Sequence, residues 1–127
     1  YGDITWCGVC AAAPEERHQK IWEIVAGARD AAWGLVSSRY PQQTVRGYEV
    51  DDACRSVIEA AGYGENFFHR TGHSIGIQDH GQGANMDHLG IYLEGDFGVR
   101  SEINVALTAE GAEITGAEPQ RELLTLL

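Results

Sequence analysis

Residues 67–81 read FFHRTGHSIGIQDHG, and this stretch carries the strongest chemical signal in the chain. Its three histidines, His69, His73 and His80, are interleaved with glycines. Glycine lets a backbone turn sharply and approach a ligand closely, and histidine supplies a metal ligand or a proton carrier near neutral pH. The four-residue spacing of His69 and His73 would suit one helix face, but the glycine and β-branched content favours strand and turn. The stretch is a candidate functional site; three independent surface histidines are the alternative.

Residues 98–108, GVRSEINVALT, alternate in character and predict one long strand. In a strand Arg100 and Glu102 share a face, and spacing alone favours a surface ion pair contributing about 0–1 kcal/mol. Asp3 lies in an apolar stretch, where an acid is costly unless it is paired or bound to metal; a solvated strand end is the alternative. Together, Asp3, His73 and Glu102 offer two carboxylates and one imidazole. This set suits Mn, Fe, Co or Zn better than Ca.

The rest of the chain predicts an α+β arrangement in which two helices cover one sheet. Residues 1–13 predict a strand, and residues 110–116 predict a hairpin return after the strand at 98–108. Apolar spacing predicts a helix from Pro14 to just before Pro41, and a second helix over 48–61 that is capped by Gly62. The apolar faces of these helices should supply the core: Ile21, Trp22, Ile24, Val25, Ala28, Ala32, Leu35, Val36, Val50, Ala53, Cys54, Val57, Ile58 and Ala61.

Composition excludes several classes of protein. The chain has 127 residues, 9 Lys and Arg against 19 Asp and Glu, and a formal net charge of −10. Such an acidic chain should repel a phosphate backbone, so nucleic-acid binding is not expected. No apolar run is long enough to span a bilayer, and no signal peptide is visible at the start, so a cytoplasmic protein without membrane attachment is expected.

The cysteines do not form a disulfide framework. Cys7 and Cys10 have C-x-x-C spacing, but no second such pair completes a zinc site, and the next helix is predicted to start several residues later than a redox motif requires. In a strand their Cα atoms would lie roughly 10 Å apart, beyond the limit of about 7 Å for a disulfide. We therefore expect two unpaired thiols here, and Cys54 as a core residue.

The blocks FFHRTGHSIGIQDHG (67–81) and GIYLEGDFGVRSEINVALT (90–108) resemble the Xaa-Pro peptidases of the pita-bread superfamily. That group includes aminopeptidase P, prolidase, methionine aminopeptidase and creatinase. YGDITW (1–6) is similar to the family's second metal-binding Asp segment, and PEERHQKIWEIVAGARDAA (14–32) to the helix after it. The resemblance implies that residues 1–127 form the C-terminal part of a pita-bread catalytic domain, with its first half upstream.

The resemblance also implies a site and a reaction. The family holds two divalent ions (Mn, Co, Zn or Fe), and the matching ligands in this chain would be Asp3, His73 and Glu102. His69 and His80 would bind substrate and stabilise a tetrahedral intermediate, while Tyr92 and Arg100 would hold the family's first Asp. Two ions about 3.5–4 Å apart would share a hydroxide that attacks the scissile carbonyl. The expected partners are a peptide with proline at its second position and a second copy in a homodimer.

Two departures from the family pattern bear on this expectation. The chain begins at the segment that matches the family's second metal-binding Asp, so the first Asp, which lies upstream in the family, is absent. The family's Glu-Pro-Gly-Ile-Tyr segment is matched by residues 87–92, DHLGIY. Either a strand with the first metal-binding Glu is missing between Leu89 and Gly90, or His88 replaces that Glu. We favour the deletion, because Leu89 would also have to replace a proline. Three of five donors remain, which predicts one ion or none; the alternatives to a peptidase are a creatinase-like amidinohydrolase and a metal-free pseudoenzyme that acts as a binding protein.

Overall fold

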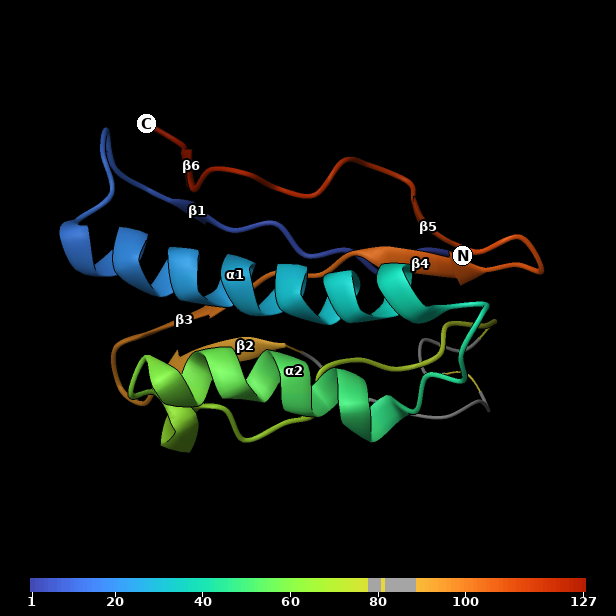
Figure 1. Cartoon of the computed structure of the whole chain (residues 1–127). Coiled ribbons are helices and arrows are strands. Elements are labelled where there is room, and N and C mark those ends of the chain that lie inside the picture. The colour runs from blue at the N-terminus through green and yellow to red at the C-terminus, as the bar shows by residue number, and fades with distance from the viewer. Residues whose placement is uncertain (78–80, 82–88) are drawn as a thin grey trace.

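Two helices that pack side by side form the centre of the fold (Figure 1). The computed structural model describes residues 1–77, 81 and 89–127. Helix α1 spans Glu16–Arg39 and helix α2 spans Gly47–Ala60, which confirms both predicted helices to within two residues. Gly62 has a φ of 85°, the left-handed conformation that ends a helix and that glycine adopts readily. The C-terminal cap predicted for the second helix is therefore confirmed.

The core lies between the helices and the strands behind them. The predicted residues Ile21, Trp22, Val25, Ala28 and Ala32 of α1 are buried, as are Val50, Cys54 and Ile58 of α2. Ile24, Leu35, Val36 and Val57 are only partly buried and pack at the edge of this cluster. The cluster is completed by residues outside both helices: Phe67, Leu89, Ile91, Val99 and Leu123. Helical periodicity therefore predicts the helix side of the core well.

Within residues 1–77, 81 and 89–127 the strands form three separate pairs, where the sequence predicted one sheet. Strands β2 (Gly90–Leu93) and β3 (Phe97–Arg100) form an antiparallel hairpin. Strands β4 (Asn104–Leu107) and β5 (Ala112–Thr115) form a second hairpin, which confirms the predicted return. Strands β1 (Gly8–Val9) and β6 (Leu124–Thr125) pair in parallel. The single strand predicted over residues 98–108 is wrong, because residues 101–103 separate β3 from β4.

The N-terminal segment is extended, although only Gly8 and Val9 of the predicted strand over residues 1–13 belong to a ladder. The backbone N–H of Asp3 donates to the side chain of Asn104 over 3.2 Å, and the N–H of Glu102 donates to the carbonyl of Thr5 over 3.3 Å. The thiol of Cys7 then donates to the carbonyl of Arg100 over 3.2 Å. Alternate residues of the segment thus face alternate residues of 100–104 in antiparallel order. Several of these contacts use side chains, so no regular ladder forms.

The three cysteines are free: Cys10 is exposed, Cys7 is half-buried and Cys54 is buried in the core as predicted. Among the described residues, no helix has both the length and the apolar character of a membrane span.

We expect Cys10 to react with iodoacetamide at pH 8 at least about tenfold faster than Cys54, because the thiolate is the reactive form. Burial disfavours that form and raises the pKa of Cys54 to about 11. Because the unfolded thiol ionises near pH 8.5, the free energy of unfolding should also fall as pH rises from about 8.5 toward 11. Mass spectrometry measures both alkylation rates. Finding only one reactive thiol after denaturation without reductant would contradict three free cysteines.

Candidate functional site

A cavity of about 590 Å³ lies between the two helices and the extended segments that face them. Its apolar lining includes Ala32, Trp33 and Val36 of α1 and Val50 of α2. Its polar lining includes Asp3, His73 and Glu102, which come from three segments far apart in the sequence, and Arg29 of α1. The fold thus brings all three predicted metal ligands to one cavity.

His73 and Asp3 are in direct contact within this cavity. The Nε2 atom of His73 lies 3.2 Å from Oδ2 of Asp3, and the imidazole is only 7% exposed. Its Nδ1 atom faces the carbonyl of Ser74 at 3.1 Å, so Nδ1–H can donate there. With Nδ1 as donor, Nε2 either carries a second proton and donates to Asp3, or presents a lone pair beside the Asp3 carboxylate. The second state is the arrangement in which histidine binds a cation, with a backbone carbonyl fixing the tautomer.

Glu102 lies in the connection between β3 and β4, and its carboxylate accepts from the hydroxyl of Thr5 and from the guanidinium of Arg100. The ion pair favoured by spacing alone is confirmed, but its placement at the surface is wrong for Glu102, because the Glu102 side chain is only 12% exposed and that of Arg100 is 33% exposed. The N-terminal segment covers the pair because Thr5 lies alongside. Burial acts against the charge of Arg100, but the hydrogen bond and the charge of Glu102 outweigh it and raise the pKa of Arg100.

His69 and Tyr92 belong to an aromatic cluster beside the site, and neither is among the described residues that line the cavity. The ring of His69 meets the ring of Tyr92 edge-on at 5.8 Å, and Phe68 stacks on Tyr92 at 6.0 Å. Burial raises the pKa of the Tyr92 hydroxyl, the nearby charge of Arg100 lowers it, and Glu102 raises it again. Tyr92 therefore lies near the charges of Arg100 and Glu102, while its role in holding the family's first Asp stays a prediction.

The described donors do not fit a two-ion centre. Among residues 1–77, 81 and 89–127, no group of three or more His, Cys, Asp and Glu side chains could hold a metal ion. Asp3 and His73 offer adjacent donors, whereas the Glu102 carboxylate faces Arg100 and Thr5. His80, predicted to bind substrate, and His88, the alternative to the missing Glu, lie outside the described residues.

Sequence reasoning missed three buried or half-buried polar residues around the site. Arg29 lies on the apolar face of α1, four residues after Val25, and its guanidinium is buried. Asp51 and Arg55 are four apart on α2 and form an ion pair at 3.0 Å that reaches the histidine stretch. The sequence contains signals that could have identified these residues. Arg29 is a charge on the apolar face of a helix, and Asp51 and Arg55 have the Asp-x-x-x-Arg spacing of a helical ion pair.

Comparison with known proteins agrees with this architecture. Residues 1–109 match the model of metallopeptidase family M24. The chain is similar to an uncharacterised peptidase of Staphylococcus saprophyticus, with 33% identity over 120 residues that cover 83% of this chain and 33% of that protein. The chain thus spans about a third of the length of that relative.

Solved structures give the same result. A prolidase from Thermococcus sibiricus superposes with a TM-score of 0.82 and 36% identity, over 98% of this chain and 36% of that one. An Xaa-Pro dipeptidase from Bacillus anthracis gives a TM-score of 0.81 and 30% identity, over 98% and 37%. An X-Pro aminopeptidase from Thermotoga maritima gives 0.78 and 30%, over 98% and 38%. The chain has the pita-bread fold and belongs to metallopeptidase family M24.

Proposed function

We propose that the protein containing this chain hydrolyses Xaa-Pro peptide bonds, as an aminopeptidase P or a prolidase does, and that residues 1–127 form part of its catalytic domain. The observation that carries the proposal is the convergence of Asp3, His73 and Glu102 on one cavity. The named functions of the superposed prolidase, dipeptidase and aminopeptidase support the choice of Xaa-Pro bonds.

The residues of the cavity are suited to the handling of protons and of a peptide. The Asp3–His73 pair can exchange a proton between a carboxylate and an imidazole, and the apolar wall can hold an uncharged side chain such as proline. His69 and His80 are proposed to contact the peptide, and Tyr92 and Arg100 to orient the carboxylates. Two divalent ions, with Mn among the candidates, would need donors beyond those that the described residues supply. A homodimer and a cytoplasmic location are also part of the proposal.

One observation favours a second function, a pseudoenzyme that binds peptides without cleaving them. The carboxylate of Asp3 contacts His73 directly, and the carboxylate of Glu102 accepts from Arg100 and Thr5. Carboxylates satisfied in this way can hold the fold together without a metal ion. The two functions differ in turnover, which makes them separable by assay.

We expect the protein expressed from its whole reading frame to cleave Met-Pro with a kcat/KM at least about tenfold above that for Met-Ala. A pocket specific for Xaa-Pro bonds accepts a tertiary amide without an N–H and is shaped to fit the proline ring. The assay follows release of free proline or alanine after dialysis against chelator and addition of Mn or Co. A Met-Pro-Gly tripeptide included in the assay separates aminopeptidase from dipeptidase activity. Equal cleavage of Met-Pro and Met-Ala would contradict Xaa-Pro specificity. Absence of cleavage with either metal would favour the pseudoenzyme.

A further inference from the structure

The stretch that carries His69 and His73 is held in place by side chains of α2. Residues 67–77 form neither helix nor strand, so regular backbone pairing within this stretch does not fix the histidines. The contacts to α2 fall on alternate residues, Phe67, His69 and Thr71. His73 lies two residues after Thr71, the last residue that α2 holds in this way.

Asp51 holds the residue midway between the two histidines. Its Oδ1 atom accepts from both the backbone N–H and the hydroxyl of Thr71, each over 2.9 Å. Its other oxygen, Oδ2, accepts from Nε of Arg55 over 3.0 Å. A carboxylate that binds two donors of one residue fixes both the position and the direction of the chain at that residue.

Arg55 holds the same stretch at His69 and Phe67, which lie two and four residues before Thr71. One terminal nitrogen donates to the carbonyl of Phe67 over 3.2 Å, and the other donates to the carbonyl of His69 over 2.9 Å. The guanidinium also lies over the ring of Phe67, 4.3 Å from its centroid, and Phe67 is buried in the core. The planar guanidinium fork directs separate N–H groups at these two carbonyls, a geometry that a lysine ammonium cannot reproduce.

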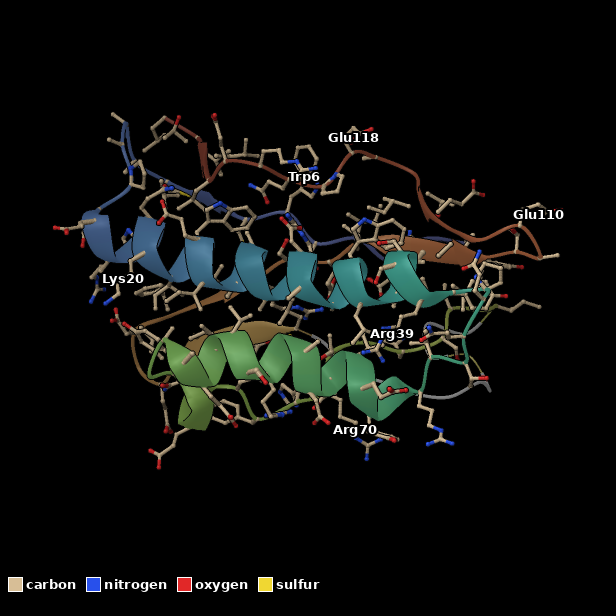
Figure 2. All side chains as sticks on the ribbon, viewed as in Figure 1. Trp6, Lys20, Arg39, Arg70, Glu110 and Glu118 are labelled. Atoms are coloured by element: carbon tan, nitrogen blue, oxygen red, sulfur yellow. The ribbon has the colours of Figure 1, made fainter. Side chains whose placement is uncertain are left out.

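We propose that Asp51 and Arg55 are positioning residues that set the places of His69 and His73 relative to Asp3 and Glu102; this proposal rests on the proposed peptidase function. Neither Asp51 nor Arg55 is among the described residues that line the cavity. They would act through residues 67–71, which they hold by hydrogen bonds. By fixing this part of the chain they would keep Nε2 of His73 at its distance of 3.2 Å from Oδ2 of Asp3. Figure 2 shows that Arg70, in the same stretch, lies on the outer side of α2, away from α1.

The test compares Asp51→Asn and Arg55→Lys with two matched controls in the protein from its whole reading frame. Asp52→Asn changes an exposed carboxylate of α2 that is the chain neighbour of Asp51. Arg39→Lys changes an arginine (labelled in Figure 2) that joins α1 to Glu49 of α2 over 2.9 Å and not to the histidine stretch. Asp51→Asn keeps the size of the side chain, and urea unfolding establishes that each variant is folded under assay conditions.

We expect both test variants to lower kcat for Met-Pro by about 10- to 100-fold with little change in KM, because a displacement near 1 Å can cost about 100-fold in rate. The controls should stay within about twofold of the wild type. The imidazole NMR signals of His69 and His73 should shift in the test variants and not in the controls. This second readout does not require turnover, so it decides the proposal even if the wild-type protein cleaves nothing and the peptidase function fails. Unshifted imidazole signals in folded Asp51→Asn and Arg55→Lys would overturn it.

Discussion

Replacing Arg29 with alanine is expected to lower the free energy of unfolding by about 3 kcal/mol, because two buried acceptors would each lose a donor at about 1–3 kcal/mol. The Arg29 side chain is only 4% exposed. Its Nη1 atom donates to the hydroxyl of Ser101 over 2.8 Å and to the carbonyl of Gln120 over 2.9 Å. Ser101 and Gln120 are themselves buried, so water reaches neither group readily. Arg29 thus joins α1 to the connection after β3 and to the C-terminal segment.

Arg121→Ala is the matched control for this prediction. Both arginines approach the carboxylate of Asp30, Arg29 at 2.8 Å and Arg121 at 3.7 Å. Arg121 is 69% exposed, so its loss should change stability by less than about 0.5 kcal/mol. Urea unfolding followed by circular dichroism measures both variants. Equal losses would show that the Asp30 ion pair, and not the buried hydrogen bonds of Arg29, is the stabilising contact.

Replacing Trp22 with alanine should lower the free energy of unfolding by about 3–5 kcal/mol, because a large buried side chain leaves a cavity that its neighbours fill only partly. Trp22 is 1% exposed and belongs to the apolar cluster formed by both helices and strands β2 and β3. The measurement is again urea unfolding, with loss of the cooperative transition as the extreme result.

Trp6→Ala is the control for Trp22. Trp6 is 49% exposed and lies in the N-terminal segment, on the other side of α1 from α2 (Figure 2). Its removal should cost less than about 1 kcal/mol. Comparable losses for the two tryptophans would contradict a core that lies between the helices and the strands behind them.

The helices could be predicted from the sequence because their core is local. Ile21, Trp22, Val25 and Ala28 recur at helical spacing, and the structure buries all four. Gly62 then marks the end of the second helix by a conformation that glycine adopts without strain. These signals come from residues that are close together in the sequence, so no knowledge of distant segments is needed.

Apart from the hairpin return at β5, the pairing of the strands and the burial of the site could not be predicted, because they depend on distant neighbours. The alternation over 98–108 predicts extended backbone, but a ladder also needs a partner strand, and Glu102 finds Thr5 of the N-terminal segment instead. The same segment covers the Glu102 carboxylate, which spacing alone places at the surface. The contact between Asp3 and His73 spans 70 residues, so no local pattern predicts it; donor chemistry and the resemblance to a known family grouped the two residues.

The most direct test of the central claim, that the cavity with Asp3 and His73 is the active site, is the kcat/KM for Met-Pro of His73→Ala beside that of His18→Ala. His18 lies in the first turn of α1 and packs edge-on against Phe97 at 4.7 Å, and it is not among the residues lining the cavity. In the protein from its whole reading frame we predict a loss of at least about 100-fold for His73→Ala and a change within about twofold for His18→Ala. Wild-type kcat/KM in a folded His73→Ala variant would contradict the claim.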